Sequence, residues 1–305
     1  MWLVGGTTHK LRPRLFRKVC ITELIIWSLY TLCMFKPTPR TSTLKCEPCL
    51  TIKSISIFSQ NIHKNKLLTN IILEVQRTFN IIFIQELLWS SISSYSNRES
   101  NELAGIPNYS NWIIFFRNLS NSNDSPRVIT YINIWLINLH FTLHNDIFNC
   151  KDILCISFFN CSFIYFLLNV YFDSSQLALK YLKDTEININ NILIITDDFN
   201  IKDSSWDLLF PYHSIHKDIL NNIADSFQLS ISSPIVQVST RYIDNQNNPN
   251  SIIDLIFLKP TSGKFNNYSI CMNWRLSSDH APITVKISIF KENVQTYHCQ
   301  NSKEE

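Results

Sequence analysis

Glycine is scarce in this sequence, with four copies in a chain of 305 residues. Because glycine is the usual residue of tight turns, asparagine and serine must form most of the turns here. An excess of charge of one sign is also missing, since the formal net charge is +3. A charge this small does not by itself indicate a nucleic-acid-binding protein, but it leaves room for a local basic groove.

A regular cysteine pattern is missing as well. The nine cysteines are odd in number and irregularly spaced, which argues against a disulfide framework and indicates free thiols in a reducing, intracellular compartment. Cys46 and Cys49 form one C-x-x-C, but no second pair stands at the spacing of a zinc ribbon. The hydrophobic content of 45% is sufficient for the core of one large domain or two small ones.

The N-terminal residues 1–50 lack a hydrophobic run of ordinary membrane-spanning length. The apolar stretch Val19–Phe35 has about seventeen residues, the short limit for a bilayer-spanning helix, and contains Glu23. Basic residues precede it, as in a signal anchor: Lys10, Arg12, Arg14, Arg17 and Lys18. Membrane insertion is disfavoured but stays an alternative to an amphipathic helix or an appended segment without a stable fold. Residues 54–290 are expected to form the main domain, and residues 291–305 a polar tail.

The chain is organised around the stretch from Ile192 to Asn200, an aliphatic run that breaks abruptly into two carboxylates and an amide. The run predicts a strand buried on both faces that delivers polar side chains to the rim of an α/β sandwich. Asp198 can accept a proton, and Asn200 can hold a water or a phosphate oxygen, which suits phosphoester hydrolysis. A strand that simply ends in an Asp/Asn turn is the alternative.

A strand–helix–strand pattern brings further polar residues to the same kind of position. The strand Ser54–Ser59 ends in Gln60-Asn61, apolar residues recur at helical spacing over Leu67–Phe79, and the strand Ile81–Ile84 runs into Gln85-Glu86. Polar groups at the carboxyl ends of neighbouring strands collect at one rim of a sheet. The middle of the chain is rich in β-branched and aromatic residues, which predicts consecutive strands of an antiparallel or mixed sheet: Val128–Asn133, Ile134–Phe141, Ile153–Phe159 and Phe163–Tyr171.

Asp254 interrupts the apolar strand Ile252–Leu258. A buried carboxylate is costly unless a cation or a donor compensates it, so Asp254 requires a neighbour. His280 in Ser277-Ser278-Asp279-His280 is the candidate. Taken alone, each of these polar residues is more often a solvated edge, packing or turn residue than part of a site.

Taken together and in order, these residues resemble the endonuclease/exonuclease/phosphatase superfamily, which has a four-layer α/β/β/α sandwich, and within it the endonuclease domain of non-LTR retrotransposons. The segments that carry the resemblance are Gln60-Asn61, Ile82-Phe83-Ile84-Gln85-Glu86, Arg127-Val128-Ile129-Thr130-Tyr131, Asn169-Val170-Tyr171, Asp198-Phe199-Asn200 with Trp206-Asp207, Thr240-Arg241, Ile253-Asp254-Leu255 and Ser278-Asp279-His280. The resemblance implies a metal-dependent DNA endonuclease whose nick leaves a 3′-hydroxyl and a 5′-phosphate. In a retrotransposon that 3′-hydroxyl primes reverse transcription.

The resemblance also implies roles for individual residues. Glu86, with Asn61 and Asp279, is expected to hold Mg²⁺, for which Mn²⁺ is an alternative. Asp198 is expected to orient or deprotonate the attacking water, and Asn200 to fix that water or the phosphate. His280 is expected to face the phosphate, and Asp254 to hold the imidazole of His280. Tyr171 is expected to donate a hydrogen bond to the phosphate. The expected substrate-binding residues are Arg241, Thr240 and Trp206. DNA is the implied partner, and the resemblance implies a monomeric, nuclear enzyme with no protein partner.

The sequence departs from the family pattern at two positions. Asp197 stands where the family usually has glycine, and Asp203 stands where retrotransposon relatives often have histidine. No reverse transcriptase follows, so we expect a free-standing or truncated copy. A phosphatase or phospholipase of the same fold, acting on a small or lipid phosphoester, and an inactive remnant are the alternative functions.

Overall fold

A computed structural model describes most of the residues between Ser54 and Ile289. The described ranges are 54–87, 110–117, 126–160, 163–185, 187, 189, 191–232, 238–243, 250–260, 268–272 and 278–289. The chain divides into two units, Met1–Cys49 and Leu50–Glu305. The expectations for residues 1–50 and for the tail 291–305 lie outside the described residues, and the proposed domain boundaries stay predictions. Within the described ranges, no helix is both long enough and apolar enough to cross a bilayer.

The first sheet has six strands in the order β11-β12-β1-β2-β4-β3. Its only parallel pair within the described residues is formed by β1 and β2, whose register sets Asn61 beside Gln85. Both strands therefore end at the same rim, which is where the strand–helix–strand pattern predicted polar residues to meet. The strands are β1 Ser54–Asn61, β2 Ile81–Gln85, β3 Trp112–Phe116, β4 Val128–Asn133, β11 Tyr268–Ile270 and β12 Ile283–Ser288.

The second sheet also has six strands, in the order β5-β6-β7-β8-β10-β9. β7 runs parallel to β8, and β8 runs antiparallel to β10, with Asp198 directly opposite Asp254. Directly opposed residues in a ladder project to the same face of the sheet, so this register brings the two carboxylates together. The strands are β5 Thr142–Leu143, β6 Ile153–Asn160, β7 Phe163–Val170, β8 Ile192–Asp198, β9 Ser230–Ser232 and β10 Asp254–Leu258.

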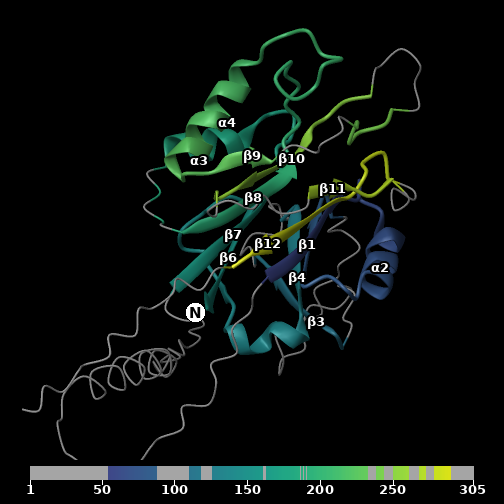
Figure 1. Ribbon diagram of the computed structural model, residues 1–305, viewed down its shortest axis with the longest axis vertical. Coiled ribbons are helices and arrows are strands. Elements are labelled where there is room, and N and C mark those ends of the chain that lie inside the picture. The colour runs from purple at the N-terminus through teal and green to yellow at the C-terminus, as the bar shows by residue number, and fades with distance from the viewer. Residues whose placement is uncertain are drawn as a thin grey trace, which may run out of the picture. The chain divides into compact units, whose positions relative to one another are not determined.

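The described elements are arranged in four layers (Figure 1), and apolar side chains pack between them. A central core lies between the sheets and contains side chains such as Ile57, Phe83 and Ile194. The helix α2 (Lys66–Val75) packs on the outer face of the first sheet. The helices α3 (Leu177–Asp184) and α4 (Ile215–Ser226) cover the outer face of the second. The predicted four-layer α/β/β/α sandwich is therefore confirmed.

The prediction of a strand over Ile134–Phe141 is wrong. The segment forms the 3₁₀ helix η2 (Ile134–Leu139), because the Asn133 side chain accepts a hydrogen bond from the Trp135 amide and begins a helical turn. His140 then takes a left-handed conformation with φ of 48°, which ends the helix. β-branched and aromatic composition indicated a strand here, but side-chain capping decided the local conformation.

Candidate functional site

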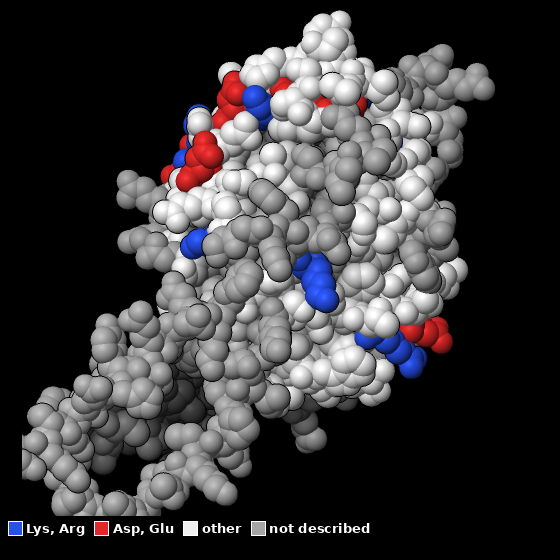
Figure 2. All heavy atoms as spheres, in the orientation of Figure 1, with Lys and Arg blue, Asp and Glu red and all other residues white. Residues whose placement is uncertain are grey.

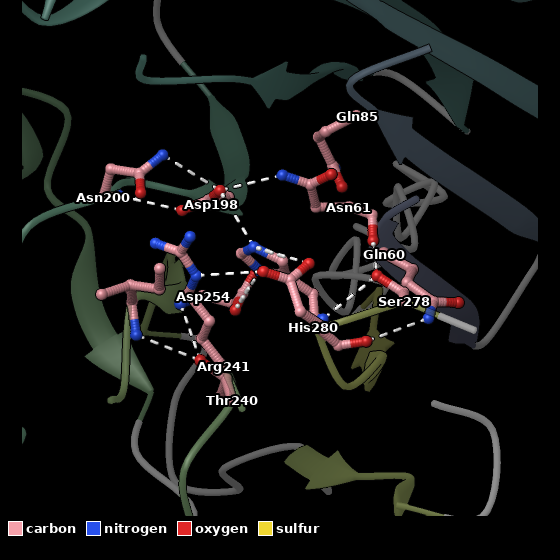
Figure 3. A network of polar contacts seen from close by, with 12 residues as sticks. Gln60, Asn61, Gln85, Asp198, Asn200, Thr240, Arg241, Asp254, Ser278 and His280 are labelled. Atoms are coloured by element: carbon pink, nitrogen blue, oxygen red, sulfur yellow. Dashed lines mark hydrogen bonds and ion pairs between the residues drawn. The ribbon is translucent and has the colours of Figure 1, made fainter. Parts of the chain in front are cut away.

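Asp198 is the most firmly held carboxylate of the candidate site (Figure 3). Its Oδ2 accepts hydrogen bonds from Asn61 Nδ2 at 2.9 Å and from Asn200 Nδ2 at 3.0 Å. Its Oδ1 accepts from the Asn200 amide at 3.0 Å, because Asn200 turns the chain back with φ of 50°. Asn200 Nδ2 also donates to the Phe172 carbonyl at 2.7 Å, so the amide N–H groups of Asn200 are used within the protein.

The pairing of His280 with Asp254 agrees with the sequence expectation. His280 Nδ1 lies 3.0 Å from both carboxylate oxygens of Asp254, and its Nε2 lies 3.6 Å from Asp198 Oδ2. All three side chains are at most 5% exposed. We call Asp198, Asp254 and His280 the histidine cluster. Because an acidic oxygen can only accept, Nδ1–H donates to Asp254 and fixes the orientation of the imidazole.

Glu86 lies at the end of β2 and belongs to a second group. Its Oε1 accepts a hydrogen bond from the Tyr171 hydroxyl at 2.8 Å, and its Oε2 lies 3.2 Å from His63 Nδ1. Asp279 completes the group, since its Oδ1 lies 3.8 Å from His63 Nδ1. We call Glu86, Tyr171, His63 and Asp279 the glutamate cluster. Glu86 and His63 both have positive φ, 51° and 46°, a conformation that costs a non-glycine residue free energy and is concentrated at functional sites.

Asp279 connects the two clusters. Its Oδ1 lies 3.8 Å from His280 Nε2, and its Oδ2 accepts a hydrogen bond from Arg241 Nε at 3.2 Å. Oδ1 is buried, yet among the described residues it has no hydrogen-bond partner. Such an atom is expensive to leave unsatisfied, which makes it a natural ligand for a cation.

Hydrogen bonds between side chains and main-chain groups hold the loop that carries His280. The Ser278 hydroxyl donates to the Asn61 carbonyl at 2.7 Å and accepts from the His280 amide at 3.1 Å. Gln60 Nε2 donates to the His280 carbonyl at 3.1 Å. Residues that are more than two hundred positions apart in the chain are therefore fixed to each other at the end of β1 (Figure 3).

Burial and mutual charge shift both titrating groups of the histidine cluster. Burial, together with the negative charge of Asp254, raises the pKa of Asp198 to about 7, although His280 acts in the opposite direction. Burial lowers the pKa of His280, but the charges of Asp254 and Asp198 outweigh it and raise that pKa to about 9. At neutral pH the imidazole is therefore protonated, and Asp198 is poised to exchange a proton.

Two sets of side chains can bind a metal ion. The histidine cluster offers three ligand atoms within 4.8 Å of one another. However, Asp254 and Asp198 already compensate the imidazole there. The expected ligands Glu86, Asn61 and Asp279 offer oxygen atoms only, which Mg²⁺ prefers, and one of them is the unsatisfied Oδ1 of Asp279. These residues fit a hard divalent cation.

Two expected substrate-binding residues, Trp206 and Thr240, have buried side chains. Trp206 is 5% exposed, packs in the core under α3 and α4, and donates its Nε1 hydrogen to the Ile201 carbonyl. Thr240 is fully buried, and its hydroxyl accepts hydrogen bonds from the Ile253 and Asp254 amides at 3.0 Å. Both side chains contact the protein interior, whereas Arg241 reaches the site through Asp279.

The two departures from the family pattern have different outcomes. The side chain of Asp197 lies outside what the structure describes. Asp203 is buried and organises the segment that follows β8: it accepts hydrogen bonds from the Ser205 and Ser214 amides at 2.8 Å, and His213 Nδ1 lies 3.1 Å away. The carboxylate therefore fixes a loop.

Sequence reasoning gave no role to His63 or to Arg127. His63 lies two positions after Asn61, and this alternation past the end of β1 was a usable signal. Arg127 stood within a quoted segment, but nothing in the sequence showed that its guanidinium lies 4.8 Å from the centre of the Tyr171 ring.

Comparisons with known proteins agree with this geometry. Residues 165–284 match the family model described as endonuclease-reverse transcriptase. The endonuclease domain of TRAS1, a telomere-specific non-LTR retrotransposon, matches with a TM-score of 0.58 and 14% identity over 78% of this chain and 100% of that domain. The AP endonuclease LMAP from Leishmania major matches with a TM-score of 0.56 and 11% identity over 84% of this chain and 93% of that protein. A comparison with curated proteins found no match.

Identities this low show the fold alone. The fold, the family-model match and the order of the motifs agree with one another. The sequence-based recognition is confirmed: the chain has the fold of the endonuclease/exonuclease/phosphatase superfamily and, within it, resembles the endonucleases of non-LTR retrotransposons.

Proposed function

We propose that this protein is a Mg²⁺-dependent phosphodiesterase that nicks DNA and leaves a 3′-hydroxyl and a 5′-phosphate. The observation that carries the proposal is the meeting of the histidine and glutamate clusters at one rim of the sandwich, joined by Asp279. The proposal includes DNA as partner, a nuclear location and a monomeric enzyme. The described Lys and Arg side chains are scattered on the face shown in Figure 2. Arg241, which donates to Asp279, is a basic side chain at the site that would contact DNA.

Asp198 is the proposed general base. Three N–H donors fix its carboxylate, and its pKa, raised to about 7, lets it accept a proton from a water near neutral pH. The water gives its proton to Asp198 as its oxygen attacks phosphorus, the bond between phosphorus and the 3′-oxygen breaks, and that oxygen takes a proton from solvent water to form the 3′-hydroxyl.

His280 is the proposed electrostatic stabiliser. Its Nδ1–H is held by Asp254, so Nε2–H is the group left to donate to a phosphate oxygen on which negative charge develops. A fixed donor in a buried site stabilises such a charge without reorganisation, which is why its orientation matters.

Glu86, Asn61 and Asp279 would hold the Mg²⁺ ion, and the Tyr171 hydroxyl keeps Oε1 of Glu86 in place. A bound divalent cation supplies a Lewis acid for the phosphate. Without this cation, the carboxylates of Glu86 and Asp279 have the 65% exposed side chain of His63 between them.

Nicking of supercoiled plasmid in Mg²⁺ tests the proposal. We expect nicking by the wild type, loss of nicking with EDTA and in Glu86→Gln and His280→Ala, and no loss in Glu74→Gln, a matched change on the exposed face of α2. The nicked plasmid should prime a DNA polymerase directly, because the product end is a 3′-hydroxyl. Phosphate release from inositol phosphates without nicking would indicate a phosphatase instead, and the absence of both activities would indicate an inactive remnant.

A further inference from the structure

Arg127 lies just before β4 and occupies a position that the proposed reaction does not use. Its side chain is 23% exposed. Nε and Nη2 donate to the two oxygens of Asp152, and Nη2 also donates to Asp173 Oδ2 at 3.0 Å. This fork fixes the plane of the guanidinium more firmly than a single ion pair can.

The fixed guanidinium lies against Tyr171. Its central carbon is 4.8 Å from the centre of the aromatic ring, within the range of a cation–π interaction. The two acidic residues that hold Arg127 are also close to the Tyr171 backbone, because the Tyr171 amide donates to the Asp152 main-chain carbonyl at 2.9 Å and Asp173 follows two positions later. The ring is therefore held through both its face and its backbone.

The same arginine also contacts the segment that carries Glu86. The Arg127 carbonyl accepts a hydrogen bond from the Leu87 amide, the residue directly after Glu86, at 3.3 Å. Because Glu86 has a positive φ, this segment needs contacts that hold it. Both ends of the Tyr171–Glu86 hydrogen bond are thus tied to Arg127.

The charges are suited to this arrangement. Burial acts to lower the pKa of Arg127, but Asp152 and Asp173 outweigh it and hold that pKa above its ordinary value. The Tyr171 hydroxyl donates its hydrogen to Glu86 Oε1 at 2.8 Å.

We propose that Arg127 is a positioning residue that orients the Tyr171 hydroxyl toward Glu86 and so acts on the reaction without touching DNA. This inference rests on the proposed function. It predicts that Arg127 and Tyr171 act as one unit, because the guanidinium has no effect on the rate other than through the phenol.

A double-mutant cycle of nicking kinetics tests this prediction. We expect Arg127→Met to lower kcat by about 3- to 30-fold while KM for DNA stays within about twofold, since a cation–π contact of this kind has that size. Arg127→Lys should keep more activity than Arg127→Met, because it retains the charge. The variant that combines Arg127→Met with Tyr171→Phe should be no slower than Tyr171→Phe alone.

Controls separate positioning from folding. Arg77→Met removes one exposed positive charge at the opposite end of β2 and should leave kcat unchanged. If Arg127→Met does not fold, Asp173→Ala removes the single contact between Asp173 and the guanidinium and takes its place in the cycle. Multiplicative losses in the double variant, or a raised KM with unchanged kcat, would overturn the inference and leave the endonuclease standing. A wild type that does not nick would overturn the proposed function itself, and this inference with it.

Discussion

The histidine cluster and the glutamate cluster face each other at the same rim but are built in opposite ways. Asp198, Asp254 and His280 are at most 5% exposed, and their charges compensate one another. Glu86 and Asp279 are 14% and 28% exposed, Glu86 has a positive φ, and one buried oxygen of Asp279 lacks a hydrogen bond. The first group is preorganised by the fold alone, whereas in the proposed function the second is completed by a bound Mg²⁺ ion.

His280→Ala should have the largest effect, on both activity and stability. It leaves Asp254 as a buried carboxylate without its cation, which costs about 3 to 5 kcal/mol when a buried pair is broken. Nicking should fall by about 10³-fold, as when a donor to a developing charge is removed. Urea unfolding and plasmid nicking measure the two effects, and unchanged stability would contradict the preorganised character of the histidine cluster.

Glu86→Gln should lower activity without lowering stability, in contrast to His280→Ala. We expect a loss of nicking of about 10²-fold or more, but a change in the free energy of unfolding within about 1 kcal/mol, since the amide can still accept from Tyr171. Mg²⁺ should raise the melting temperature of the wild type and not that of the variant. A variant that Mg²⁺ still stabilises would place the cation elsewhere, for example in the histidine cluster.

The pH dependence of stability should follow the histidine cluster when divalent cations are absent. Burial and acidic neighbours leave the pKa of Asp198 at about 7 and that of His280 at about 9 in the folded protein. Both values exceed the ordinary pKa values of the two groups, so the folded state binds more protons than the unfolded state. The free energy of unfolding therefore falls as pH rises from the ordinary pKa of each group to its raised pKa, up to about 9.

Urea unfolding at pH 6 and pH 9 measures this fall. His280→Ala should reduce it, because the histidine no longer releases a proton in that range. Asp254, Asp198 and Asp279 are the acidic groups that act on His280 here. An increase in stability between pH 6 and pH 9 would be inconsistent with a protonated, doubly compensated imidazole.

His63→Asn should have the smallest effect. Asparagine tolerates the left-handed conformation, and His63 is 65% exposed, so stability should change by less than about 0.5 kcal/mol. We expect nicking to change by less than about fivefold, measured beside Glu86→Gln. A loss as large as that of Glu86→Gln would show that the His63 side chain is as important for nicking as Glu86.

The sequence predicted the layers and most strands because buried strands leave a clear apolar pattern, as in Ile192–Asp198. It also predicted the pairing of Asp254 with His280, since an acidic residue in an apolar strand requires a neighbour. The 3₁₀ helix after Asn133 depends on one side-chain cap and was missed. The stacking of Arg127 on Tyr171 depends on how β4 and β7 approach each other across the two sheets, which no local pattern contains.

The direct opposition of Asp198 and Asp254 in the ladder between β8 and β10 has a consequence for how this fold tolerates change. Backbone hydrogen bonds, which any sequence can form, set the separation of these two carboxylates, and a slip by one residue would turn one of them to the opposite face. Loops can therefore diverge widely in sequence while these two carboxylates keep their alignment, and changes that shift the register of β8 against β10 are the ones that would separate them.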